Sequence, residues 1–132
     1  MEKQIENKSL RFLLAVHGLL TLLASIVLIT APDVIPKMVN INLSPDEFLL
    51  CYFLGAGELC IAFLSFFARK LRDKSSLRLI SATFIVFHFS TGVLEVFALG
   101  KNGINSTLIL NVLLRILISI LFWYFGIYRN KK

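Results

Sequence analysis

The side chains of this chain that are best suited to chemistry are ionisable groups placed inside long apolar segments. Segment 77–99 carries a histidine, His88, and a glutamate, Glu95, in an otherwise apolar run. Ser81, His88 and Glu95 are spaced at i, i+7 and i+14, and Thr91 lies on the same stripe. One face of a helix would therefore hold nearly all the polarity of this segment, and it must point away from lipid.

Three further apolar segments supply groups of the same kind. They are His17 in segment 12–30, Glu58 in segment 48–67, and Asn111 and Arg115 in segment 108–128. At a rise of about 1.5 Å per residue, Glu95 would lie about 6 Å below the outer boundary, Arg115 about 10 Å, and Glu58 and His88 about 15 and 16 Å. This series predicts an outward-opening intramembrane pocket whose ligand-binding residues are Glu58, His88, Glu95, Asn111 and Arg115.

Arg115 needs an acidic partner at its depth. A charged side chain at the centre of a membrane helix costs about 2.5–3.5 kcal/mol even on the lenient insertion scale. Glu58 and Glu95 would lie about 5 Å and about 4 Å from Arg115 in depth. We expect Glu58 and Arg115 to meet, with Glu95 as the alternative partner, and such a pair can also be a purely structural clamp.

The two histidines raise the question of a bound haem. Ligation of one iron by both imidazoles needs similar depths. His17 would lie about 8 Å from the cytoplasmic boundary and His88 about 16 Å from the outer one, several Å apart in depth, which disfavours haem. No metal site is predicted from cysteine and histidine spacing, and no other cofactor is indicated. His88 is then either a core histidine with a hydrogen-bond partner or a titrating group in a proton relay.

Composition identifies a membrane protein. The chain is 57% hydrophobic, contains twelve Phe in 132 residues and has a mean hydropathy of +0.79, more than a soluble domain of this length carries. Its net charge of +6 does not indicate nucleic acid, because the basic residues form short clusters between apolar segments. Cys51 and Cys60 would lie about 13 Å apart on one helix, too far for a disulfide.

The apolar segments 12–30, 48–67, 77–99 and 108–128 are each long enough to cross a bilayer as a helix. They predict an all-α, four-helix transmembrane bundle that forms a single domain. The connection 31–47 contains all three prolines and is apolar enough to lie along the membrane interface. Ser44 and Glu47 predict a capping box before the second span, and Asn105 or Ser106 is placed to cap the fourth.

The second predicted span has a seam of small and polar residues at alternating steps of four and three. Its members are Cys51, Gly55, Glu58, Ala62 and Ser65. This spacing collects them on one face, as close packing between membrane helices requires.

The basic residues predict the orientation. Of the 14 Lys and Arg residues, all except Lys37, Lys101 and Arg115 lie in the two terminal segments or around the connection between the second and third spans. The positive-inside rule then places both termini in the cytoplasm. We expect a multi-pass protein of the cell membrane, which is the inner membrane if the source is bacterial.

Three short motifs resemble a known family. Gly55-Ala56-Gly57-Glu58 resembles the G-x-x-E motif in the second helix of DoxX-like membrane proteins, and Phe87-His88 and Leu114-Arg115-Ile116-Leu117 are similar to segments of that group. The resemblance implies a small four-helix bundle with short loops, with Glu58 as the motif acid. It implies no single activity, since some members are linked to quinone-coupled sulfur oxidation and others to accessory or assembly roles. His17 and Glu95 have no counterpart in the family.

The sequence favours a binding or accessory role over an enzymatic one, and no catalytic residues are predicted. The expected ligand is a small amphipathic molecule such as a quinone or a lipid headgroup. The alternative occupant is a transmembrane helix of a second copy or of another membrane protein. A proton-coupled transporter that uses Glu58 and His88, and a membrane subunit of a quinone-linked oxidoreductase, are further alternatives.

Overall fold

The computed structural model describes residues 7–129, in which helices are the only regular secondary structure. The elements are α1 (Lys8–Thr30), α2 (Val34–Met38), the short 3-10 helix η1 (Pro45–Glu47), α3 (Phe48–Ala68), α4 (Lys74–Asn102), α5 (Ser106–Phe122) and the π-helical continuation η2 (Trp123–Tyr128). Four helices are long and apolar enough to cross a membrane. This confirms the predicted helical class and the number and order of the spans, as expected of a multi-pass membrane protein.

The predicted helix starts are confirmed. The Glu47 carboxylate accepts hydrogen bonds from the backbone N–H of Ser44 at 2.7 Å and from its hydroxyl at 2.9 Å, and the first turn after this cap is the 3-10 helix η1. Asn105 caps α5, because its Oδ1 accepts the backbone N–H of Leu108 at 3.0 Å. These caps satisfy donors that the first turn of a helix leaves free.

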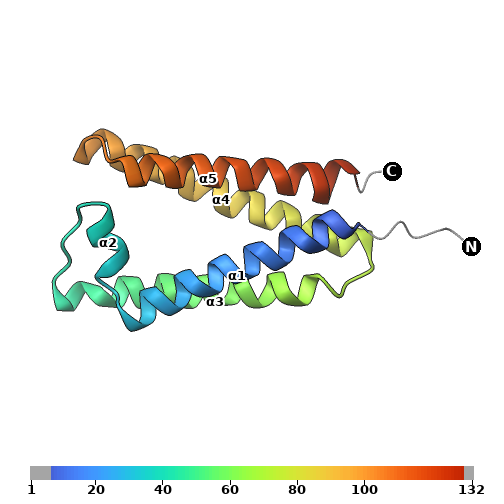
Figure 1. Cartoon of the computed structure of the whole chain (residues 1–132), viewed down its shortest axis with the longest axis horizontal. Helices are drawn as coiled ribbons and strands as arrows, with labels where there is room; N and C mark the ends of the chain where they lie inside the picture. Colours follow the sequence, from blue (N-terminus) through green and yellow to red (C-terminus); the bar gives the residue numbers. More distant parts are fainter. Residues whose placement is uncertain (1–6, 130–132) are drawn as a thin grey trace, which may run out of the picture.

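The long helices form two antiparallel hairpins. α1 packs along α3, and α4 packs along α5 and η2, whereas the backbones of the two hairpins come closest where α1 meets α5 and η2. Figure 1 shows the hairpins close together at the end where the termini and the α3–α4 connection lie, and farther apart toward the end that carries α2. We call these the closed end and the open end. The arrangement is compatible with the expected bundle, but its two halves are packed differently.

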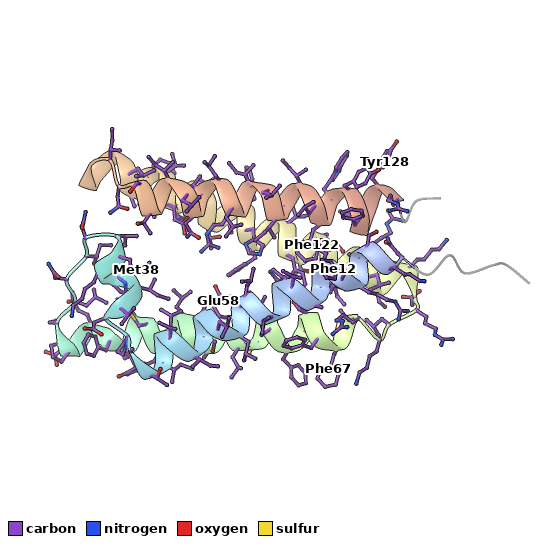
Figure 2. All side chains as sticks on the ribbon, viewed as in Figure 1. Phe12, Met38, Glu58, Phe67, Phe122 and Tyr128 are labelled. Carbon is purple, nitrogen blue, oxygen red and sulfur yellow. The ribbon has the colours of Figure 1, made fainter. Side chains whose placement is uncertain are left out.

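A hydrophobic core joins the hairpins at the closed end. Its buried members are Leu10, Leu14, Ala68, Phe84 and Phe122. They come from all four long helices, and Phe122 is fully buried between the hairpins (Figure 2). The many exposed apolar side chains on the outside are suited to contact with lipid, which lies around the spans of a membrane protein.

Small residues bring α1 and α3 together. The predicted seam of α3 is confirmed, since its buried residues are Cys51, Gly55, Glu58, Ala62, Ser65 and Ala68. A Cβ added to Gly55 would lie 2.8 Å from Cγ1 of Ile29, so the backbones approach as closely as glycine allows. Both cysteines are free, as their expected separation on one helix requires; Cys51 is buried and Cys60 is exposed.

Candidate functional site

An arginine and a glutamate form an ion pair between α4 and α5. Arg115 Nε donates to Glu95 Oε1 at 2.8 Å, and Arg115 Nη1 donates to Thr91 Oγ1 at 2.9 Å. Asn111 Nδ2 donates to the same Glu95 oxygen at 2.8 Å. We call Thr91, Glu95, Asn111 and Arg115 the arginine cluster. The expectation that Arg115 pairs with Glu58 was wrong, and the alternative partner Glu95 is the one used.

The turn between α4 and α5 explains this choice. Glu95 and Arg115 are equally distant in sequence from Asn105, which caps α5 in that turn. In an antiparallel helical hairpin, residues equally far from the turn lie at the same height and face each other if their helix faces agree. Glu58 lies on α3 of the other hairpin, and the two hairpins are farther apart toward the open end (Figure 1). Equal depth was therefore necessary for pairing but did not determine the partner.

Glu58 is buried without a hydrogen bond. Its side chain is 8% exposed, and in the part of the chain that the structure describes it forms no hydrogen bond or ion pair. Figure 2 shows it on the side of α3 that faces the other hairpin. Arg115 is the charged residue that acts on Glu58 electrostatically, although it is committed to Glu95. Glu58 thus lies near the arginine cluster but is not part of it.

The two histidines are in direct contact. His17 Nε2 lies 2.8 Å from His88 Nε2, and His17 Nδ1 lies 2.8 Å from Ser65 Oγ. The expected difference of several Å in depth between the histidines was therefore wrong. The count of helical rise assumed upright helices, whereas α1 runs obliquely to α4 and α5 (Figure 1). The sequence also missed Ser65 as a partner of His17, although Ser65 belongs to the predicted seam of α3.

The geometry of this histidine pair does not fit a haem. Two nitrogen ligands on opposite sides of one metal lie about 4 Å apart, because each metal–nitrogen bond is about 2 Å long. The two Nε2 atoms are at hydrogen-bond distance instead. The rings of Phe84 and Phe122 also pack against His17, with centroids at 4.7 and 5.0 Å, where a porphyrin would need space. Among the described residues no group of three or more His, Cys, Asp or Glu could hold a metal ion.

Two buried polar atoms have no hydrogen-bond partner in the described part of the chain. They are His88 Nδ1 and Glu95 Oε2. Thr91 links the two regions, because its hydroxyl donates to the backbone carbonyls of Phe87 and His88 and accepts from Arg115. The histidine pair and the arginine cluster therefore follow one another along α4, and each contains an unsatisfied buried atom.

A separate pocket lies near the beginning of α4. Its volume is about 390 Å³, and it is lined by Ser75, Arg78, Leu79, Ala82 and Ile127. None of the predicted ligand-binding residues lines it. The predicted site residues instead form two adjacent groups: His88 with the histidine pair, and Glu95, Asn111 and Arg115 with one another, with Glu58 facing them from α3.

Comparison of the chain with protein-family models, with curated proteins and with solved structures found no match in any of the three. The resemblance to DoxX-like membrane proteins stays a prediction that depends on its short motifs.

Proposed function

We propose that this chain is a membrane binding protein that holds a small amphipathic molecule, such as a quinone or a lipid headgroup, against the polar groups that face one another between the two hairpins. The observation that carries the proposal is the presence of unsatisfied buried polar atoms, His88 Nδ1 and Glu95 Oε2, next to an arginine. Leaving such an atom unpaired costs about 1–3 kcal/mol, and proteins rarely do so without a reason. A bound molecule would supply the missing partners.

The hydrogen-bonding capacity of the arginine cluster supports this proposal. A guanidinium has five N–H donors, and Arg115 uses its Nε–H for Glu95 and one Nη1–H for Thr91. Donors of Arg115 therefore remain for a polar head, and Glu58 adds a carboxyl group without a hydrogen bond on the opposite hairpin. The surrounding side chains are apolar, as the tail of an amphipathic ligand requires.

A proton-coupled transporter is the second candidate. The contact series from Ser65 through His17 to His88 favours it, because hydroxyl and imidazole groups in hydrogen-bonded chains can pass protons. We rank it below the binding role because many transport sites are formed by a pair of broken helices. The four spans in the described part of the chain contain no such pair.

We propose that both ends of the chain are cytoplasmic, so that the closed end faces the cytoplasm and the open end faces outward. The basic residues Arg69, Lys70, Arg72 and Lys74 around the α3–α4 connection support this orientation. A tag at either terminus should then be labelled only from the cytoplasmic side of intact cells. Labelling of a carboxyl-terminal tag from outside would reject the proposed topology of four spans with both termini in the cytoplasm.

The binding role can be tested by native mass spectrometry of protein extracted together with its lipids. We expect the wild-type protein to retain a small molecule that Arg115→Gln loses, because the substitution removes the guanidinium and its remaining donors. Arg72→Gln is the matched control, since it removes an exposed arginine of the α3–α4 connection that belongs neither to the arginine cluster nor to the lining of the pocket. Equal retention by the wild-type and Arg115→Gln proteins, or no retained molecule in the wild type, would reject the proposal.

A further inference from the structure

The contacts of the histidine pair determine where its protons lie. His17 and His88 face each other through their Nε2 atoms at 2.8 Å, so one Nε2 must carry a proton and the other must accept it. The rings of Phe84 and Phe122 that pack around His17 favour neutral imidazoles, because burying a charge among apolar groups costs more than burying a neutral ring. Two neutral arrangements remain.

In the first arrangement, Ser65 donates its hydroxyl proton to His17 Nδ1, and His17 Nε2–H donates to His88 Nε2. His88 then carries its own proton on Nδ1. In the second arrangement, both hydrogen bonds run in the opposite direction: His88 Nε2–H donates to His17 Nε2, and His17 Nδ1–H donates to Ser65 Oγ. His88 Nδ1 is then a bare acceptor, and the Ser65 hydroxyl proton needs another acceptor.

The surroundings of Ser65 distinguish the two arrangements. Ser65 is fully buried, and among the described residues its hydrogen-bond partner is His17 alone. In contrast, Ser25, Ser81 and Ser119 donate to backbone carbonyl oxygens. The second arrangement therefore leaves two buried groups unsatisfied, the Ser65 hydroxyl proton and His88 Nδ1, whereas the first leaves only His88 Nδ1. Since each such group costs about 1–3 kcal/mol, the first arrangement is the more stable one.

We infer that His88 carries its proton on Nδ1 and donates it to an oxygen acceptor of the bound molecule, so that the ligand of this protein is a neutral carbonyl compound. This inference rests on the proposed binding function and specifies the chemistry of the ligand. His88 is 4% exposed, and its Nδ1 is buried without an acceptor in the described part of the chain. A carbonyl oxygen supplies an acceptor without bringing a charge into the apolar surroundings of the pair.

The same reasoning describes the other side of the ligand. Glu95 is two helical turns from His88 on α4, which corresponds to about 10 Å of helical rise. Its Oε2 is an acceptor without a donor, while Arg115 retains unused donors beside it. The arginine cluster can therefore bind both acceptors and hydroxyl groups, whereas His88 Nδ1 offers only a donor. The requirement for an acceptor oxygen, which a neutral carbonyl meets, comes from His88.

Nuclear magnetic resonance of the histidine rings tests the proton assignment without any ligand. The chain contains only two histidines, so a sample with isotope-labelled ring nitrogens in detergent gives two sets of signals, and His17→Gln assigns them. We expect His17 to be protonated on Nε2 and His88 on Nδ1 at neutral pH. A His88 ring protonated on Nε2, or a charged ring, would overturn the inference.

Two variants test the ligand chemistry, because each replaces a different half of the imidazole. His88→Asn keeps an amide N–H near the position of Nδ1 and loses the contact with His17, whereas His88→Gln reaches the position of Nε2 and lacks a donor at Nδ1. The probe is a para-benzoquinone carrying a decyl chain, added to protein in neutral lipid nanodiscs and followed by equilibrium dialysis. Decylbenzene, which has the same chain but no carbonyl, measures non-specific partition.

We expect the quinone to bind the wild type and His88→Asn with similar affinity and His88→Gln about tenfold more weakly, which is the loss of about one hydrogen bond. Decylbenzene should not distinguish the three proteins. Equal quinone binding by the two variants, or no quinone binding above that of decylbenzene, would overturn the carbonyl inference. Failure here is distinguishable from failure of the proposed function, because the retained molecule in native mass spectrometry is measured without assuming its chemistry.

Discussion

The two hairpins of this protein have the same topology but are held together in different ways. Between α1 and α3, small residues let the backbones approach closely, and the hydroxyl of Ser25 donates to the backbone carbonyl of Gly55 at 2.7 Å. Between α4 and α5, Phe84 packs against Phe122 at the closed end, and Arg115 and Glu95 form an ion pair farther along the two helices. One interface is therefore mainly van der Waals packing, and the other adds a half-buried ionic network to its apolar contacts.

This difference supports the proposed binding role of the polar groups on α4 and α5. Small-residue packing is sufficient to join two helices in a membrane, as α1 and α3 demonstrate. A half-buried ion pair is a costly way to do the same, because desolvation offsets much of its attraction. Within the described residues, the two fully buried atoms without a partner, His88 Nδ1 and Glu95 Oε2, both lie on α4 of the second hairpin. The polar groups of α4 and α5 thus exceed what packing requires.

The largest expected effect comes from breaking the ion pair on one side. Glu95→Leu should destabilise the protein by about 3 kcal/mol or more, because it leaves the Arg115 guanidinium without its acid, and this group cannot lose its proton. Arg115→Leu should cost less, since a carboxyl group left alone can become neutral by binding a proton. The measurement is thermal unfolding in detergent, followed by circular dichroism.

The double variant Glu95→Leu/Arg115→Leu should recover much of the loss, because no uncompensated charge remains. Glu58→Leu is the matched control: it removes a buried acid that forms no hydrogen bond in the described chain, so it should destabilise much less than Glu95→Leu. Simple addition of the two single effects would mean that Glu95 and Arg115 are not coupled. A larger effect for Glu58→Leu than for Glu95→Leu would make Glu58 the partner of Arg115.

A smaller effect is expected from overfilling the first hairpin. Gly55→Ala adds a Cβ at 2.8 Å from Ile29 Cγ1 and 3.3 Å from the backbone oxygen of Ser25, so α1 and α3 must separate slightly. Overpacking of this kind costs about 1–3 kcal/mol. Gly57→Ala is the control on the same helix, because a Cβ there meets no atom within 4 Å. Equal melting temperatures for the two variants would contradict the close packing of α1 and α3 at Gly55.

The smallest effect concerns the connection between the hairpins, where Asp73 caps α4. The Ser76 hydroxyl and backbone N–H, and then the Ser75 N–H, donate to the Asp73 carboxylate and lower its pKa below the ordinary value of 3.8. A carboxyl whose folded-state pKa is lowered stabilises the fold above its unfolded pKa, and this contribution is lost as the pH falls through the folded value. Asp73 therefore adds stability at neutral pH that disappears in acid.

Asp73→Asn keeps the shape of the cap and removes its charge. We expect the variant to melt at a slightly lower temperature than the wild type at pH 7, with a difference that shrinks as the pH falls below about 4, where the aspartic acid of the wild type also becomes neutral. Melting curves of both proteins across this range provide the measurement. A difference that is constant with pH would show that the charge of Asp73 does not act on the helix.

The sequence by itself determined the elements of this protein. Hydrophobic length fixed the four spans because a bilayer sets the length that a helix must have. Spacing at three and four residues identified the buried seam of α3, and local side chains fixed the caps at Ser44 and Asn105. These features depend on residues that are neighbours in the chain, and their physical causes can be read from it. The polar stripe of α4 was visible for the same reason.

The tertiary structure decided which polar groups meet. Depth along straight helices made Glu58 and Glu95 nearly equal as partners of Arg115, and it separated His17 from His88. Whether two groups touch depends also on which helices are neighbours, on their rotation and on their crossing. Because the turn between α4 and α5 is short, Arg115 and Glu95 lie opposite each other and pair. Because α1 runs obliquely to α4, the Nε2 atoms of His17 and His88 lie 2.8 Å apart. Helical rise gives only the depth of a residue, whereas a contact also depends on its position within the plane of the membrane.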